Sequence, residues 1–101
     1  MCTISYERRL RRLRIAGPCV EGDRAAVQHA ISTSAAGEDT LTIDLTAATA
    51  LGRSVAAAIV AARDARAGGR RITVLRRHRS DVDRQLAAAE RDAAAGTDVT
   101  G

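Results

Sequence analysis

Aromatic side chains are nearly absent from this chain of 101 residues. Tyr6 is the one aromatic residue, and the sequence contains neither Phe nor Trp. Proteins that bind single-stranded nucleic acid stack bases on aromatic faces, and cages for cationic ligands are built from aromatic rings. Neither kind of site is therefore expected. Alanine makes up about half of the hydrophobic residues, so the core must be built from Leu, Ile, Val and Ala.

Long hydrophobic runs are missing as well. No stretch approaches the roughly 20 apolar residues of a membrane-spanning helix. The first residues, MCTISYERR, lack the apolar segment of a signal peptide. We therefore expect a cytoplasmic protein without membrane insertion. The length suits one domain, which we place at residues 1–95, followed by a flexible C-terminal tail at 96–101.

Cysteine is scarce, with Cys2 and Cys19 only. Two cysteines cannot complete a zinc site by themselves, and this pair lacks the CxxC spacing of redox and metal sites. If the first two segments form a hairpin, both residues fall at its open end, where a disulfide is geometrically feasible. Because cytosolic thiols are kept reduced, we expect two free thiols and a fold that needs no metal, cofactor or disulfide.

Hydrophobic periodicity predicts an α/β domain with the element order β-β-α-β-α-β-α. Strands are expected at 2–7, 12–16, 40–45 and 71–76, and helices are expected to begin at Asp23, Ser54 and Ser80, the second one ending at Ala67 before Gly68-Gly69. The βαβ unit at 40–76 requires a parallel strand pair. Since the first two strands form an antiparallel hairpin, the sheet is a small mixed one with the helices packed on it.

Single residues set the expected boundaries and burial. Gly17-Pro18 is expected to end the second strand, and Asp23 and Ser80 to cap their helices. The apolar centre of RITVLR is typical of a parallel strand covered on both faces. The expected buried helical positions are Ala26, Val27, Ala30 and Ile31, then Val55, Ile59, Val60 and Ala62, then Val82, Leu86, Ala89 and Ala93, whereas Arg63, Asp64 and Arg66 are expected to face water.

The sequence offers little support for an enzyme. His29 lies beside a helical stripe and His78 in an arginine-rich loop, and neither has a nucleophile or an acid at a recognisable spacing. The glycines form neither a GxGxxG nor a GxxxxGK(S/T) loop. We therefore interpret the chain as a non-enzyme without catalytic, cofactor-binding or metal-binding residues.

All sixteen basic residues are arginine, and with twelve acidic residues the net charge is +4. The arginines crowd at Arg8, Arg9, Arg11, Arg12 and Arg14 and again at Arg70, Arg71, Arg76, Arg77 and Arg79. Both clusters have the chemistry to contact phosphates. The acidic residues dilute the charge and no recognition helix is visible, so we expect no specific nucleic-acid binding. A solvated arginine-rich surface is the simplest interpretation, and an acidic protein partner comes next, because arginine pairs with carboxylates through two hydrogen bonds.

The segment from Asp44 to Val55 is the most informative. A strand ends in Asp44-Leu45-Thr46, the pair Ala50-Leu51 follows, and Gly52-Arg53-Ser54-Val55 opens a helix. In order and spacing the chain resembles the STAS family, the sulfate-transporter and anti-sigma-factor-antagonist domain, from about residue 2 to residue 92. That family has Asp-Leu-Ser/Thr at the strand end and Asp-Ser-Ser/Thr-Gly at the start of the helix. The strand Leu13–Gly17 and the turn and strand at Ala67–Val74 also resemble the family.

The resemblance implies a STAS-like fold and a role in partner-switching control of transcription. An anti-sigma factor antagonist binds an anti-sigma factor that is also its kinase. Position for position, the resemblance assigns the phosphoacceptor role to Ser54 and partner binding to Gly52, Arg53, Ser54 and Val55. The motif is degenerate, because Gly52 stands where the family has Asp and Val55 where it has Gly. From the residue alone, Ser54 is equally explained as the N-cap of its helix.

A second functional class stays open beside the first. The resemblance to STAS domains also allows the chain to be an accessory subunit that docks on a transporter or ATPase complex. Such a subunit would use the same surface without phosphorylation. The sequence also leaves open whether the chain forms a homodimer.

Overall fold

The N-terminal hairpin forms as the alternation of residues predicts. The computed structural model describes residues 2–65 and 70–99, with side chains up to residue 95. In it, β1 (Thr3–Glu7) and β2 (Arg12–Cys19) are antiparallel. A 3-10 turn, η1 (Arg8–Leu10), joins them, and Arg11 completes the reversal with a left-handed φ of 49°.

β2 continues past Gly17-Pro18, so the prediction that the strand ends there is wrong. Gly17 has a φ of 78°, and the pairing register shifts between Gly17 and Pro18. This irregularity lets the strand pass a proline, which has no N–H to donate to a ladder. Beyond it, β2 pairs in parallel with β4 (Ala48–Leu51), a strand that the sequence pattern did not predict.

The described residues form a mixed sheet of five strands in the order β1-β2-β3-β5, with β4 paired to β2 beside this path. β3 (Thr40–Asp44) and β5 (Arg71–Leu75) are parallel, as the βαβ unit requires. β5 is the last strand of the order, and its Thr73 and Leu75 are exposed. It is therefore an edge strand. Because the exposed side chains lie on one of its faces, the expectation that β5 is covered on both faces is wrong.

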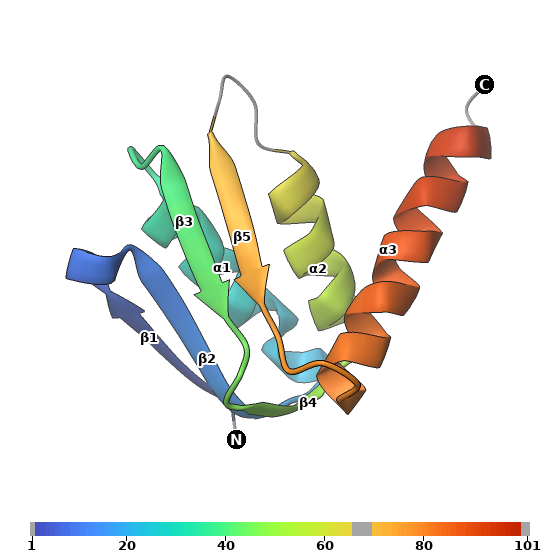
Figure 1. Ribbon diagram of the computed structural model, residues 1–101, viewed down its shortest axis with the longest axis horizontal. Helices are drawn as coiled ribbons and strands as arrows, with labels where there is room; N and C mark the ends of the chain where they lie inside the picture. The colour runs from blue at the N-terminus through green and yellow to red at the C-terminus, as the bar shows by residue number, and fades with distance from the viewer. Residues whose placement is uncertain (1, 66–69, 100–101) are drawn as a thin grey trace.

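The helices pack on the sheet, as expected, and they lie on one side of it. α1 (Arg24–Ala35) and α2 (Arg53–Asp64) lie behind the strands, and α3 (Asp81–Val99) packs beside α2 and β4 (Figure 1). The opposite face, which we call the open face, is not covered by any described element (Figure 1). The radius of gyration is 13.0 Å, as expected for a compact domain of about 100 residues. None of the described helices combines the length and apolar character needed to cross a membrane.

Helix boundaries differ from the expected ones at several caps. Gly52 is the N-cap of α2, so Ser54 lies inside the first turn and the prediction of Ser54 as N-cap is wrong. Asp23 is the N-cap of α1 as predicted, but it makes no side-chain cap bond to that helix. Its Oδ2 instead accepts a hydrogen bond from the N–H of Val20, the residue before the 3-10 turn η2 (Glu21–Asp23). Ser80 caps α3 as predicted, because its Oγ accepts the Asp83 N–H at 3.1 Å.

The ends of the second and third helices bear on two further expectations. α2 ends at Asp64, and the expected helix end at Ala67, the stop at Gly68-Gly69 and the solvent-facing Arg66 lie outside the described residues. α3 runs to Val99, so the segment predicted as a tail from residue 96 continues as helix; residues 100–101 lie outside the description.

The core lies between the sheet and the helices and consists of aliphatic side chains. Its fully buried members include Leu13, Ile15, Val27, Leu41, Ile43, Leu45, Val55, Ile59, Val60, Val82 and Leu86. Of the expected helical stripe, Ala30, Ala62 and Ala89 are partly buried, and the prediction of buried Ala26 and Ala93 is wrong because both are exposed. Arg63, expected to face water, is partly buried because it pairs with Glu90 of α3.

Candidate functional site

The turn after β3 directs the chain towards α2. Asp44 Oδ1 accepts hydrogen bonds from the Thr46 N–H at 2.9 Å and the Thr46 hydroxyl at 2.6 Å. Burial alone would raise the pKa of Asp44, but the bonds from Thr46 and the neighbouring Arg12 and Arg14 lower it below its usual value. The ionised carboxylate thus fixes the bend. This accounts physically for the Asp-Leu-Thr end of the strand.

Gly52, the residue before α2, lies directly against the η2 turn. Its N–H donates to the Cys19 carbonyl at 2.6 Å. A Cβ on Gly52 would lie 2.8 Å from Glu21 Oε1, 3.0 Å from the Glu21 nitrogen and 3.1 Å from the Val20 carbonyl carbon. These separations are shorter than a van der Waals contact, so no side chain fits at this position without displacing the turn. The aspartate that the STAS family has at this position would require the Glu21 side chain to move and the turn backbone to shift slightly.

Glu21 supplies the negative charge at the start of α2. The Ser54 N–H donates to both Glu21 carboxylate oxygens at 3.1 Å, across 33 residues of sequence. The Ser54 hydroxyl, followed by the Ser54 N–H and Arg53, lowers the pKa of Glu21 below its usual value. An anionic group is stabilised there because the first amides of a helix lack intrahelical acceptors. Glu21 therefore acts as the cap that Gly52 cannot provide.

The structure brings together three of the four predicted binding residues at the surface. Gly52 and Ser54 are partly exposed, and Arg53 projects into solvent with 86% of its side chain exposed, 3.8 Å from Asp92 of α3. Val55 is completely buried. The prediction that Val55 binds a partner is therefore wrong for its side chain, which packs in the core.

A groove of about 820 Å³ lies between α2 and α3, and Ser54 is among the residues that line it. Glu21, Arg53 and Asp92 contribute polar groups to it, and alanine is the commonest residue of its lining, including Ala57, Ala61 and Ala88. Small side chains leave the two helices room to form this groove. We call it the α2–α3 groove. Sequence reasoning missed Glu21 and Asp92, because no local pattern reveals contacts made by segments so distant in sequence.

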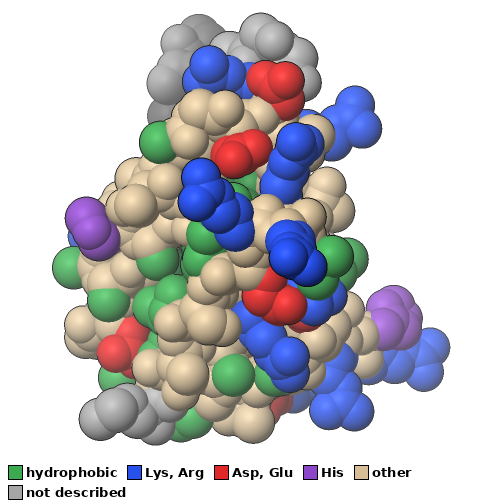
Figure 2. Space-filling view, turned by 90° about the vertical axis from the view of Figure 1, so that its left-hand side faces the viewer, with side chains coloured by type: hydrophobic (Ala, Val, Ile, Leu, Met, Phe, Trp, Pro, Cys, Tyr) green, Lys and Arg blue, Asp and Glu red, His purple; other side chains and the backbone are tan. Residues whose placement is uncertain are grey.

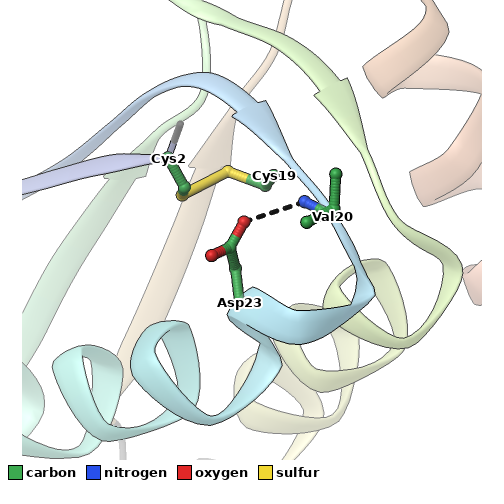
Figure 3. Close-up of a disulfide and its surroundings, with 4 residues drawn as sticks. All are labelled: Cys2, Cys19, Val20 and Asp23. Atoms are coloured by element: carbon green, nitrogen blue, oxygen red, sulfur yellow. Dashed lines mark hydrogen bonds between the residues drawn. A yellow bond between two sulfur atoms is a disulfide. The ribbon is translucent and has the colours of Figure 1, made fainter.

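The cysteines hold the η2 turn in place. The antiparallel hairpin brings Cys2 next to Cys19 with a Cα–Cα distance of 4.9 Å, and the two form a disulfide (Figure 3). The prediction of two free thiols is therefore wrong. The hairpin geometry brings the cysteines within disulfide range, and the argument from a reducing compartment did not decide their pairing. Next to Cys19, the Val20 N–H donates to Asp23 Oδ2 at 2.9 Å (Figure 3). Both bonds anchor the segment that carries Glu21.

The two arginine clusters are only partly neutralised. Arg12 makes a bidentate pair with Glu7 at 3.0 and 3.2 Å, and Arg76 pairs with Asp83 and Glu90. Viewed from the β1 side, arginine side chains gather on the half of the surface that belongs to the open face (Figure 2). Many of them extend into solvent, as the interpretation of a solvated arginine-rich surface requires.

Both histidines are exposed. His78 Nδ1 lies 4.0 Å from Asp83 Oδ2, and 86% of its side chain is exposed. His29 lies on the exposed side of α1. Within residues 2–65 and 70–99, no three His, Cys, Asp or Glu side chains are arranged to hold a metal ion.

In comparisons with known proteins, no family model matches this chain and no curated protein matches it. The resemblance to the STAS family therefore stays a prediction from the sequence.

Proposed function

We propose that the chain is a protein-binding module of the anti-sigma factor antagonist type, which binds its regulatory partner in the α2–α3 groove. The position of Ser54 carries this proposal. Ser54 lies in the first turn of α2 and lines the groove, and its N–H donates to both carboxylate oxygens of Glu21. A partner seated in the groove would cover the Ser54 hydroxyl.

A phosphate on Ser54 would make the charge of the groove beside Glu21 more negative. It would add about −1.5 to −2 charges beside the Glu21 carboxylate, which already accepts the Ser54 N–H. The two anions would repel each other and compete for the same helix terminus. Phosphorylation would therefore displace Glu21 and weaken the binding of a partner that fits the unmodified groove.

The occupied helix terminus also favours the second candidate, an accessory subunit that docks on a transporter or ATPase complex without phosphorylation. Glu21 already provides the negative charge, and an aspartate in place of Gly52 would have to displace Glu21. In this alternative the groove binds its partner constitutively, and Ser54 serves only to hold Glu21.

Capture from host extract separates the two candidates. The baits are wild-type protein, Ser54→Glu, and Ser32→Glu as the matched control at an exposed serine of α1. The captured protein is identified, purified and titrated. A kinase-like ATPase that binds Ser54→Glu at least tenfold more weakly, about 1.4 kcal/mol, and Ser32→Glu normally, supports the first candidate.

A groove-blocking variant completes the test. Ala61→Arg places a bulky charged side chain in the α2–α3 groove and should weaken either partner. If a transporter or ATPase subunit binds Ser54→Glu normally but loses Ala61→Arg, the accessory role holds. If a verified partner binds Ser54→Glu, Arg53→Glu and Ala61→Arg as tightly as wild type, the binding surface lies elsewhere.

A further inference from the structure

The outer edge of β5 is a sheet edge without a described neighbour. β5 pairs only with β3 among the described strands. The Arg71 N–H donates to the Asp39 carbonyl and the Leu75 carbonyl accepts the Leu45 N–H, both at 2.8 Å. Because backbone groups alternate in direction along a strand, the N–H and C=O groups of Ile72 and Val74 point towards the outer edge. That edge is therefore a template for one more strand.

The side chains of β5 on the open face are accessible. Arg71 and Thr73 are exposed, and so is 41% of Leu75, one of the exposed large apolar residues of the described chain. No described element lies in front of β5 on this face (Figure 1). A strand added at the edge would thus gain apolar contact with Leu75 as well as backbone hydrogen bonds.

Positive charge lies at both ends of the same edge. Arg70 precedes β5, Arg71 begins it, and Arg77 and Arg79 follow it. The guanidinium groups of these four residues form no ion pair with any described residue. Arg76 differs, because Asp83 holds it at 2.9 Å and Glu90 at 3.1 Å. The unpaired guanidinium groups are suited to carboxylates, which they bind through two parallel hydrogen bonds.

We propose that the outer edge of β5 binds an extended acidic segment of a partner protein by strand addition. The backbone of the segment pairs with Ile72 and Val74, as in other β-augmented complexes. Carboxylates near its two ends pair with Arg70 and Arg71 and with Arg77. This surface is separate from the α2–α3 groove, so the proposal does not rest on the function of Ser54.

Charge argues against the other occupants of this edge. In an antiparallel pair of two copies, the arginines at the start of one β5 would face those at the end of the other, and like charges repel across strands. Nucleic acid would use the arginines but leave the backbone groups of Ile72 and Val74 unpaired. An acidic strand satisfies both features at once.

A synthetic peptide tests the proposal. The probe is acetyl-Glu-Glu-Val-Thr-Val-Glu-Glu-amide, titrated by calorimetry into the full chain. Arg71→Glu combined with Arg77→Glu should weaken binding at least tenfold. The matched control, Arg24→Glu combined with Arg91→Glu, makes the same change in net charge at exposed arginines of α1 and α3 and should change affinity less than twofold.

Two further measurements isolate strand addition from general charge attraction. The bound peptide should slow hydrogen exchange at the Ile72 and Val74 amides, and N-methylation of its central valines should abolish binding without any change in the protein. Unprotected Ile72 and Val74 amides, equal binding of the N-methylated peptide, tighter competing binding of duplex RNA, or self-association of the protein through β5 would each overturn the proposal.

Discussion

Gly52 shows how one missing side chain shapes the start of α2. Its φ is −64°, an ordinary value, so glycine is not required for conformational freedom. Glycine is favoured for reasons of space, because a Cβ would lie 3.0 Å from the Glu21 nitrogen and 3.1 Å from the Val20 carbonyl carbon, so the backbone of the turn would have to shift. The carboxylate that caps the helix therefore arrives from another segment, at Glu21, which then engages Ser54.

Substitution of Gly52 by alanine should separate the η2 turn from α2. We expect Gly52→Ala to lower the free energy of unfolding by about 1–3 kcal/mol, as overpacked sites generally do, measured by urea denaturation. Gly22→Ala is the control, because a Cβ there meets nothing within 4 Å. Adding Glu21→Ala should restore only part of the loss, since backbone atoms also obstruct the methyl group. Equal stabilities of the Gly52 and Gly22 variants would contradict this account.

At the scale of elements, strongly periodic segments were predictable and weakly patterned ones were not. β3 and α2 show their buried positions as clear periods of two and of about three and a half residues, so sequence alone located them. β4 reads Ala-Thr-Ala-Leu, too short and too alanine-rich for a recognisable strand pattern. Pro18 marks a stop in most strands, and only the pairing with β4 and the register shift reveal that β2 continues.

The location of the candidate site was predictable from the sequence, but the contacts between its residues were not. The motif placed Ser54 at the start of a helix, and the structure has it in the first turn of α2. The participation of Glu21 depends on β2 and η2 passing close to that turn, which is a tertiary contact across 33 residues. Such contacts leave no periodic signal along the chain.

Glu90 joins three elements, and this gives a prediction with a pH dependence. Its carboxylate accepts hydrogen bonds from Arg63 of α2 at 2.7 Å and from Arg76, just after β5, at 3.1 Å. The bond from Arg63 is the main cause that lowers the pKa of Glu90 below its usual 4.5. We expect Glu90→Gln to reduce the free energy of unfolding by about 1 kcal/mol at neutral pH.

The sign of the pH effect follows from the lowered pKa. The folded state favours the ionised carboxylate, so its contribution is present above pH 4.5 and is lost as the pH falls through the lower folded-state pKa. Urea titrations of wild type and Glu90→Gln should therefore converge in acid. Asp92→Asn, at a carboxylate that is 68% exposed, serves as control and should change little at any pH. A difference that persists in acid would show that Glu90 acts through packing.

At the scale of the whole molecule, one disulfide closes the open end of the β1–β2 hairpin. The disulfide joins residues 17 apart. Closing a loop of this size restricts the unfolded chain and typically contributes roughly 3 kcal/mol. The aliphatic core still lies between the sheet and the helices on its own, so the fold should survive reduction with lower stability.

Cys2→Ala isolates the cross-link, because Cys2 is only partly buried and Cys19 keeps its buried position. We expect this variant to lose roughly 3 kcal/mol of unfolding free energy while its far-UV circular dichroism stays native at room temperature. A dithiol reductant should produce the same loss in the wild type and none in the variant. A wild type that melts identically with and without reductant would show that the bond contributes nothing.

The disulfide also decides how the protein should be attached to a support. It ties Cys2 to Cys19, two positions from Glu21, which lines the α2–α3 groove, so we expect a resin or fusion partner joined to the N-terminus to lie near the turn that carries Glu21. α3 carries the other end of the chain away from the sheet (Figure 1). A C-terminal tag is therefore expected to leave Ser54 accessible. An N-terminal tag is expected to obstruct the surface under test, so that a true partner would appear not to bind.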